Sequence, residues 1–171
     1  MKINKNQQNG FTIVELLIVV VVIAILAAIT IVSFNGIQTR AKNAQQVSAV
    51  NEYAKGLRAY QAANGGMPWY GVACFDGTDC WSGTSTTAAA ASMRADLKTV
   101  MGQTLPTIST PYAALLANAT TTDVPNGGNY SGYYILYQHS DTGSCIPIGG
   151  ARYLNGAGSS GGIRTCRAAI E

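Results

Sequence analysis

The fold of this chain is determined by one long apolar stretch near its N-terminus, Gly10-Phe11-Thr12-Ile13-Val14-Glu15-Leu16-Leu17-Ile18-Val19-Val20-Val21-Val22-Ile23-Ala24-Ile25-Leu26-Ala27-Ala28-Ile29. The segment from Leu16 to Phe34 carries no charge, and its roughly 19 residues, at about 1.5 Å per helical residue, match the hydrocarbon core of a bilayer. Only a helix satisfies the backbone groups of a single segment in that setting. The sequence therefore predicts a membrane-spanning helix, although many of its residues are β-branched.

Glu15 is the one charge in this stretch, and no further charge follows until Arg40. A carboxylate in an apolar segment is costly to insert and usually marks a functional site. The nearest base on the N-terminal side is Lys5. Cleavage between Gly10 and Phe11 would create an α-amine four residues before Glu15, one helical turn away. If that amine paired with the Glu15 of a neighbouring subunit, the pairing would fix the axial offset between subunits, because charges in an apolar bundle are tolerated when matched.

The lysine-containing leader, Gly10, Phe11, Thr12, Glu15 and the long apolar run resemble the N-terminus of type IV pilins and of the pilin-like proteins of type II secretion and DNA uptake. The resemblance implies cleavage after Gly10 by a prepilin peptidase and N-methylation of Phe11. It also implies extraction from the membrane into a helical filament by an inner-membrane assembly platform with its ATPase. In such a filament Glu15 would neutralise the amine of an adjacent Phe11.

Three other interpretations of the apolar run compete with this one. A secretory signal peptide has a shorter apolar region, followed by a small-residue cleavage site. A plain single-pass anchor explains the length of the run but neither Glu15 nor the Gly10-Phe11 junction. A buried helix of a small soluble protein is rarely apolar on every face.

The 171 residues leave room for one small head domain after the leader and the spanning segment. We expect a leader at 1–10, a hydrophobic membrane and filament-core helix at 11–36, an amphipathic continuation of that helix at 37–64, and a head at 65–171. The leader is basic and should remain cytoplasmic. The resemblance and the cysteines place the head outside the cytoplasm, first on the cytoplasmic membrane and then at the cell surface.

The net charge of +3 includes Lys2 and Lys5 of the leader, so cleavage would leave nine basic against eight acidic residues. A nearly neutral protein lacks the clustered lysine and arginine that a general grip on nucleic acid requires. Any contact with DNA or another ligand would be local. The candidate for such a contact is the small arginine cluster near the C-terminus, Arg152, Arg164 and Arg167.

Four cysteines follow the apolar run: Cys74, Cys80, Cys145 and Cys166. Their even number in an exported head predicts two disulfides. Three connectivities are open, and local chain closure favours Cys74 with Cys80 and Cys145 with Cys166. A zinc site is the alternative, but the sequence has no Cys-x-x-Cys, and its single histidine, His139, has no partner nearby in the sequence. We expect neither metal nor cofactor.

An amphipathic pattern follows Gly36, in which Val47, Val50, Ala54 and Leu57 form a stripe typical of a helix that packs on a sheet. Tyr53 and Tyr60 flank this stripe. The sequence predicts that the helix ends near Ala63, before Asn64-Gly65-Gly66. The Asn35-Gly36 pair predicts a kink or a local break. A second helix is expected from Thr86 or Thr87 to Met101, where Gly102 ends it, with Met93, Leu97 and Val100 on one face.

The strongest strand signal covers 130–138, which holds Tyr133, Tyr134, Ile135, Leu136 and Tyr137. Segments 145–148 and 151–154 are the next candidates, with Pro147 at an edge position. The prolines and threonines before them read as loop, with a short helical turn at 112–116. Together these elements predict an α+β fold, the pilin fold, in which the long helix packs on a small antiparallel sheet.

Several shorter motifs carry little information. Asp76 and Asp79 lack the full loop pattern of a calcium site. The glycines from Gly156 to Gly161 match a dinucleotide fingerprint by letters only, so we expect a flexible loop there. The Asn118 and Asn129 glycosylation patterns arise often by chance. No serine, histidine and aspartate set, and no pair of carboxylates, is arranged for catalysis, so we expect no enzyme.

The sequence therefore favours a prepilin that polymerises through its N-terminal helix into a filament for adhesion, twitching motility or DNA uptake. Its expected partners are further copies of itself, other pilins, the peptidase and the assembly platform. The alternative is a minor pilin, or a pseudopilin of a type II secretion or competence system. A membrane-tethered binding module is a third hypothesis, but Gly10, Phe11 and Glu15 argue against it.

Overall fold

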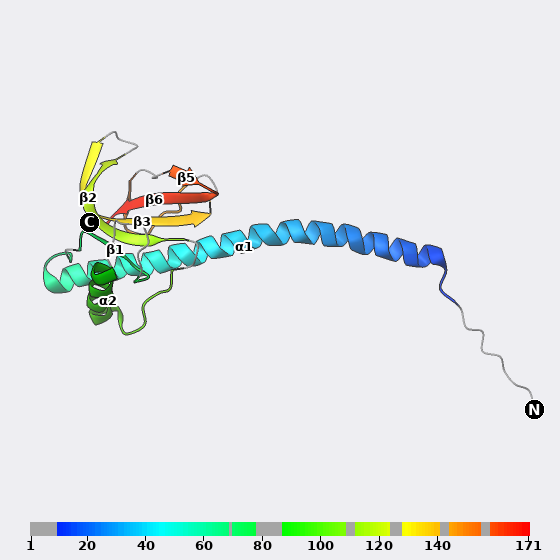
Figure 1. Cartoon of the computed structure of the whole chain (residues 1–171), viewed down its shortest axis with the longest axis horizontal. Helices are drawn as coiled ribbons and strands as arrows, with labels where there is room; N and C mark the ends of the chain where they lie inside the picture. Colours follow the sequence, from blue (N-terminus) through cyan, green and yellow to red (C-terminus); the bar gives the residue numbers. More distant parts are fainter. Residues whose placement is uncertain are drawn as a thin grey trace, which may run out of the picture. The chain divides into compact units, whose positions relative to one another are not determined.

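The structure, a computed structural model, describes residues 10–68, 70–77, 87–108, 112–123, 128–140, 144–154 and 158–171, and the side chains of these residues except 32–33, 119–123 and 128–129. The element order is α1, β1, α2 and then β2 to β6 (Figure 1). The chain divides into two compact units, Met1–Arg40 and Ala41–Glu171, and helix α1 (Ile13–Asn64) runs through both.

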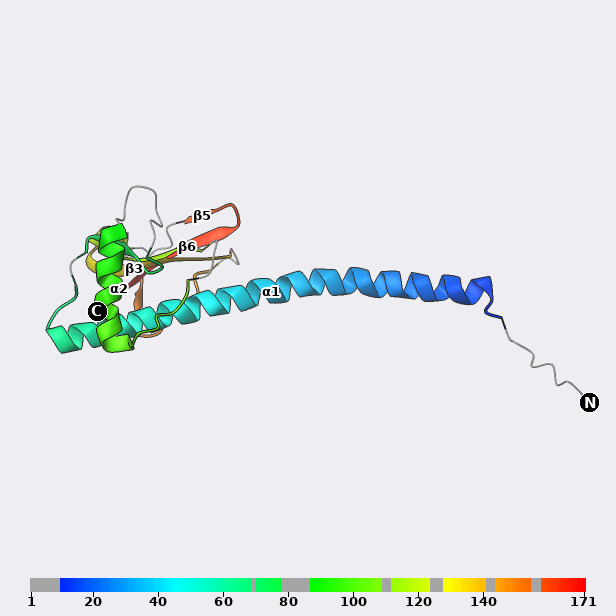
Figure 2. The same ribbon diagram turned by 60° about the horizontal axis from the view of Figure 1, so that its bottom comes forward.

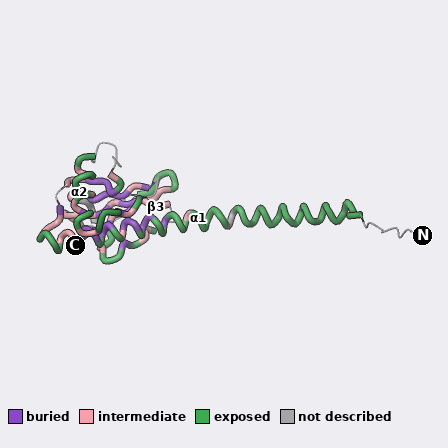
Figure 3. Tube along the Cα trace, turned by 90° about the horizontal axis from the view of Figure 1, so that it is seen from below, coloured by how far each residue is buried: buried purple, intermediate pink, exposed green. Residues whose placement is uncertain are grey.

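In the first unit α1 carries the apolar run, and every described side chain from 11 to 31 is exposed (Figure 3). The helix is long and apolar enough to cross a bilayer, with a mean hydropathy of 3.3 in its most apolar window. The local break expected at Asn35 and Gly36 is wrong, because α1 continues through both residues. One helical glycine costs about 1 kcal/mol relative to alanine, which the regular turns on either side outweigh.

In the second unit α1 contributes a buried stripe, and the predicted core positions Val47, Val50, Ala54 and Leu57 are all buried. Tyr53, expected beside the stripe, is fully buried within it. Its ring stacks on Phe75 with centroids 4.2 Å apart, and its hydroxyl lies 2.8 Å from the carbonyl oxygen of Pro106. A tyrosine can enter a core when its hydroxyl finds such an acceptor.

The end of α1 follows the prediction. Asn64 is the last helical residue, and Gly65 adopts a φ of +76° while its N–H donates to the carbonyl of Gln61 at 2.9 Å. This left-handed glycine cap satisfies a terminal carbonyl without a side-chain clash. Helix α2 (Thr87–Met101) ends in the same way at Gly102, with a φ of +94°. The second helix is therefore where the sequence predicted it.

One antiparallel sheet of six strands forms the rest of the second unit, in the order β1-β2-β3-β6-β4, with β5 also paired to β6. Figure 2 shows the strands from a second direction. The strands are β1 (Val72–Cys74), β2 (Ala114–Asp123), β3 (Gly128–Ser140), β4 (Arg152–Tyr153), β5 (Gly158–Ser160) and β6 (Ile163–Ala169). The predicted α+β class, a long helix on a small antiparallel sheet, is confirmed.

The two faces of the sheet have different neighbours. Leu116, Ile135, Tyr137 and Ala168 belong to the large core cluster that includes the buried stripe of α1. The opposite face carries a smaller cluster formed by Cys74, Ala90, Leu115 and Ala117. Helix α2 reaches both clusters, since Met93 and Leu97 belong to the first and Ala90 to the second.

Coverage on both faces explains why one strand was missed. The segment 112–116 was expected to form a helical turn, but β2 begins at Ala114 and continues through the threonines that read as loop. Leu115 and Leu116 are both buried, one on each face of the sheet. Such a strand lacks the alternation of apolar and polar residues that identifies strands in a sequence. Its pairing with β3 over ten residues joins distant segments, so local sequence patterns do not indicate it.

The C-terminal part of the sheet also differs from the expectation. Segment 145–148 is not a strand, and Tyr137 donates a hydrogen bond from its hydroxyl to the carbonyl of Ile146. The strand beside β3 is instead β6, which pairs from Ser140–Ile163 to Tyr134–Ala169. The expected loop between Gly156 and Gly161 contains β5, while residues 155–157 lie outside the described residues.

A close contact at Gly56 gives a test of the packing between α1 and α2. A Cβ at this position would lie 2.6 Å from Cγ and 2.1 Å from Sδ of Met101. Alanine normally stabilises a helix by about 1 kcal/mol relative to glycine, but overpacking costs about 1–3 kcal/mol. We therefore expect Gly56→Ala to lower the unfolding midpoint of the head in the detergent-solubilised full chain.

Gly36→Ala is the matched control on the same helix, because a Cβ there meets nothing within 4 Å. It should not lower the midpoint. The double variant Gly56→Ala and Met101→Ala should recover part of the loss that Gly56→Ala causes. If Gly56→Ala is as stable as Gly36→Ala, α2 does not pack on α1 in this way.

The buried Tyr137 gives a test in alkaline solution. Burial raises the pKa of its phenol above the ordinary value near 10. A folded-state pKa above that of the unfolded chain means that the stabilisation is complete below about pH 10 and is lost as pH rises further. We expect the free energy of unfolding to fall above pH 10. The fall should be smaller in Tyr137→Phe, measured by chemical denaturation, and equal slopes would contradict the burial.

Candidate functional site

The start of α1 is organised by a reciprocal pair of side chains. Thr12 Oγ1 accepts the Glu15 N–H at 3.2 Å, while Glu15 Oε2 accepts the Thr12 N–H at 3.0 Å and the Thr12 hydroxyl at 2.8 Å. The helix begins at Ile13, so Thr12 is the N-cap residue and Glu15 is the third helical residue. This arrangement is a capping box, in which each side chain satisfies a backbone N–H that the helix leaves open.

The capping box gives Glu15 a local role that our sequence analysis missed. The signal was present in the letters, since Thr-x-x-Glu before an apolar run is the pattern of a capping box. The carboxylate also lies at the positive end of the helix dipole, where a negative charge is stabilised. Glu15 is therefore partly satisfied within its own chain, and both Thr12 bonds go to Oε2.

Gly10 and Phe11 precede the helix. Both residues are non-helical, and Phe11 is 79% exposed. A Cβ added at Gly10 would meet nothing within 4 Å. The junction between them is thus accessible, as a cleavage site must be, and it lies directly before the capping box. The rest of the leader, including Lys2 and Lys5, lies outside the described residues.

Among the described residues of the first unit, nothing covers the apolar run that follows. Its large side chains, for example Leu17 at 58% and Ile29 at 60%, are exposed although they are aliphatic. A continuous exposed apolar surface of this kind marks contact with a membrane or with other proteins. The carboxylate of Glu15 stands at the beginning of this surface.

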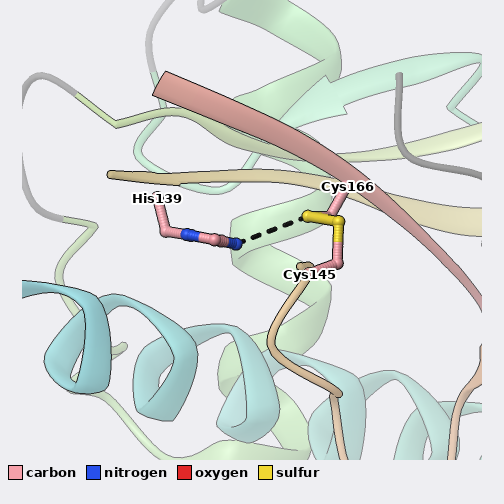
Figure 4. Close-up of side chains that lie close together, drawn as sticks. All are labelled: His139, Cys145 and Cys166. Atoms are coloured by element: carbon pink, nitrogen blue, oxygen red, sulfur yellow. Dashed lines mark hydrogen bonds between the residues drawn. A yellow bond between two sulfur atoms is a disulfide. The ribbon is translucent and has the colours of Figure 1, made fainter. Parts of the chain in front are cut away.

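The head contains a disulfide between Cys145 and Cys166, with their Cα atoms 5.8 Å apart. This is the pairing that local chain closure favours. Cys74 is disulfide-bonded as well, and its predicted partner Cys80 lies outside the described residues. His139, which has no partner nearby in the sequence, lies beside this disulfide in the fold, with its Nε2 3.5 Å from Cys166 Sγ (Figure 4).

The three C-terminal arginines do not form one patch. Arg164 and Arg167 lie on β6 three residues apart and therefore point to opposite faces of the sheet. Arg152 pairs with Glu171 at 3.2 Å and lies over the ring of Tyr130, 5.3 Å from its centroid. Arg152 stands opposite Ala169 in the register of β4 and β6 and therefore shares a face with Arg167, so the structure separates Arg164 from the other two arginines that we considered for contact with DNA or another ligand. Of the two aspartates considered for calcium, Asp76 is exposed and Asp79 lies outside the described residues.

Comparison with known proteins identifies the N-terminal segment. Residues 5–31 match the sequence profile described as the prokaryotic N-terminal methylation motif. The chain is also 32% identical to fimbrial protein Q of Moraxella bovis over 121 residues, which cover 70% of this chain and 75% of that protein. No solved structure matches the chain.

The capping box predicts a local effect of Thr12. Thr12→Ala removes the cap that accepts the Glu15 N–H, and loss of such a cap costs about 1 kcal/mol of helix stability. We expect amide hydrogen exchange in the first turn of α1 to become about fivefold faster in detergent micelles. Thr30→Ala is the matched control, because Thr30 Oγ1 donates to the carbonyl of Ala27 inside the helix. Equal exchange in Thr12→Ala and the unmodified chain would contradict the cap.

Proposed function

Because this chain belongs to the type IV pilin family, whose methylation motif and fimbrial relative match its sequence, we propose that its mature form is the repeating subunit of a surface filament. A prepilin peptidase cleaves the precursor between Gly10 and Phe11, and Phe11 is N-methylated. The subunit waits in the cytoplasmic membrane until an assembly platform with its ATPase adds it to the filament. Adhesion, twitching motility and DNA uptake are the tasks that such a filament can perform.

The observation that carries this proposal is the geometry around Glu15. Cleavage leaves the new ammonium of Phe11 at the positive end of the helix dipole, which is an unfavourable place for a cation. Glu15 is the negative charge of the first turn. Since Oε2 already accepts both Thr12 bonds, Oε1 is the oxygen that remains for the ammonium.

The exposed apolar run explains why the Phe11 ammonium of a neighbouring subunit is the better partner for Glu15. A bilayer and a bundle of identical helices both cover this surface, but lipid offers the charged helix end no fixed counterion. In a bundle, the Phe11 ammonium of one subunit can pair with the Glu15 carboxylate of the next. Matched charges are tolerated in an apolar bundle and unmatched ones are costly, so this pairing selects one axial offset.

A minor pilin or a pseudopilin remains the second candidate, since both use the same N-terminal segment. The named relative is a fimbrial protein, which favours the filament subunit. The two candidates differ in filament length and abundance at the cell surface.

Glu15→Gln separates charge pairing from capping. Glutamine at the third helical position preserves a capping box but removes the negative charge. We expect this variant to insert into the membrane and to be cleaved, yet to yield at least about tenfold fewer sheared filaments, as loss of a charge pair worth about 1.4 kcal/mol or more per subunit implies.

Thr12→Ala serves as the matched control, because it weakens the cap and keeps the charge. It should assemble better than Glu15→Gln. Normal filaments from Glu15→Gln, or equal losses in the two variants, would show that Glu15 acts only as a helix cap. The yield is measured by shearing cells and quantifying the subunit, with the membrane-bound pool as the reference.

A further inference from the structure

The disulfide between Cys145 and Cys166 has two chemically different ends. Cys166 Sγ belongs to a fully buried residue of β6, and the fully buried imidazole of His139 lies against it, 3.5 Å away. Cys145 lies before β4, outside the strands, and is only partly buried. Cys145 is therefore the less buried end for an external thiol or disulfide to approach. The imidazole of His139 lies against Cys166 (Figure 4).

The hydrogen bonds of His139 decide which nitrogen faces the sulfur as an acceptor. His139 Nδ1 lies 2.7 Å from the carbonyl oxygen of Ser140, so Nδ1 carries the proton and Nε2 has the lone pair. Ser140 is itself fixed, because its N–H donates to Asn43 Oδ1 at 2.9 Å and its carbonyl lies 3.4 Å from Asn43 Nδ2. The imidazole is thus held with its basic nitrogen directed at Cys166.

The described side chains beside His139 do not offer Cys166 a base that could accept its proton. The phenol of Tyr137, on the same strand, donates to the carbonyl of Ile146, and its ring centroid lies 6.4 Å from that of His139. Arg164 stands opposite His139 in the register of β3 and β6 and is a cation, so it cannot accept a proton. Among the described residues, His139 is the base in contact with this disulfide.

We propose that His139 is the proton acceptor that activates Cys166 during closure of this disulfide, and that Cys145 is the cysteine that first exchanges with an external disulfide oxidant. The Cys145 thiolate attacks one sulfur of the oxidant, the oxidant's S–S bond breaks, and one thiol of the oxidant leaves. Cys166 then gives its proton to His139 Nε2, and its thiolate attacks the Cys145 sulfur of the mixed disulfide. The second oxidant thiolate leaves with the electron pair and takes up a proton, so two cysteine thiols are oxidised and one oxidant disulfide is reduced.

The order of the two cysteines follows from general rules of thiol exchange. The rate depends on which sulfur can be reached and on the thiolate fraction of the attacking group. A thiol next to an imidazole loses its proton more readily than an isolated thiol. Burial alone would make Cys166 the inert end, whereas the contact with His139 makes it a competent nucleophile for the internal step.

The first test uses the folded, oxidised full chain in detergent with a chelator present. A brief exposure to reduced glutathione is stopped with iodoacetamide, and the peptides are mapped by mass. Because the reverse reaction uses the same path, we expect glutathione on Cys145 and the alkyl group on Cys166. Glutathione mainly on Cys166, or equally on both cysteines, would overturn the order.

The second test measures closure in the reduced full chain with oxidised glutathione, comparing the unmodified protein with His139→Gln. Glutamine keeps a polar side chain but cannot accept the proton. Pairing with an imidazole raises the thiolate fraction of a thiol about tenfold, and the accompanying loss of nucleophilicity takes back about threefold. We expect closure of the Cys145–Cys166 bond to be slowed by at least about threefold in the variant.

The disulfide that holds Cys74 is an internal control in the same molecule. Cys74 shares a face with Leu136 through the register of β1, β2 and β3, and His139 lies three residues further along β3 on the opposite face, so the substitution should leave the closure rate of the Cys74 disulfide unchanged. Equal slowing of both disulfides would mean that His139 only supports the fold. An unchanged rate for Cys145–Cys166 would mean that it does not act as the proton acceptor, and either result overturns its role.

Discussion

A carboxylate at the head of a long apolar helix is the constraint on which the rest of this structure depends. Within its own chain, the Glu15 carboxylate finds hydrogen-bond partners by forming a capping box with Thr12. That solution fixes the start of α1 and orients the carboxylate at the helix end. In the part of the chain that the structure describes, the apolar surface behind Glu15 is exposed, as is typical of a surface that contacts a membrane or other proteins. The proposed assembly rests on these two features, the capped carboxylate and the exposed apolar surface.

The head is organised around a hydrophobic core of its own. The second half of α1 buries its stripe against the antiparallel sheet, with Leu57 and Tyr53 fully buried, and α2 packs beside β1. Two of its buried polar side chains find partners within the head, Tyr53 in the carbonyl of Pro106 and Asn43 in Ser140. The head can therefore fold around its own core, so the N-terminal segment is free to be specialised for the membrane and for the filament.

The sequence predicted what depends on local chemistry. The extent of α2, the glycine caps at Gly65 and Gly102, and the core stripe of α1 all follow from spacing and from single residues. Strands β2, β5 and β6 were missed, because their identity depends on pairing between distant segments, whereas β4 lies within the predicted segment 151–154. Leu115 and Leu116 illustrate the difficulty, since burial on both faces removes the alternation that marks a strand.

The same distinction between local motifs and contacts between distant residues applies to the candidate sites. Gly10, Phe11 and Glu15 could be singled out because they lie within one short motif. The cap between Thr12 and Glu15 is also a local pattern, Thr-x-x-Glu, but from the sequence we considered only the charge of Glu15. The contact between His139 and Cys166 could not be read, because 26 intervening residues separate them and only the register of β3 and β6 brings them together. The arginines were grouped because they are close in sequence. Arg164 and Arg167 nevertheless lie on opposite faces of the sheet, because they are three residues apart on one strand.

The most direct test of the central claim is the intact mass of the protein sheared from the cell surface, combined with N-terminal sequencing. We expect a chain that begins at N-methylated Phe11 and lacks two hydrogens for each disulfide. A chain that still begins at Met1 and occurs only in membranes, from cells shown to contain the peptidase, would contradict it and would identify a tethered protein that does not polymerise.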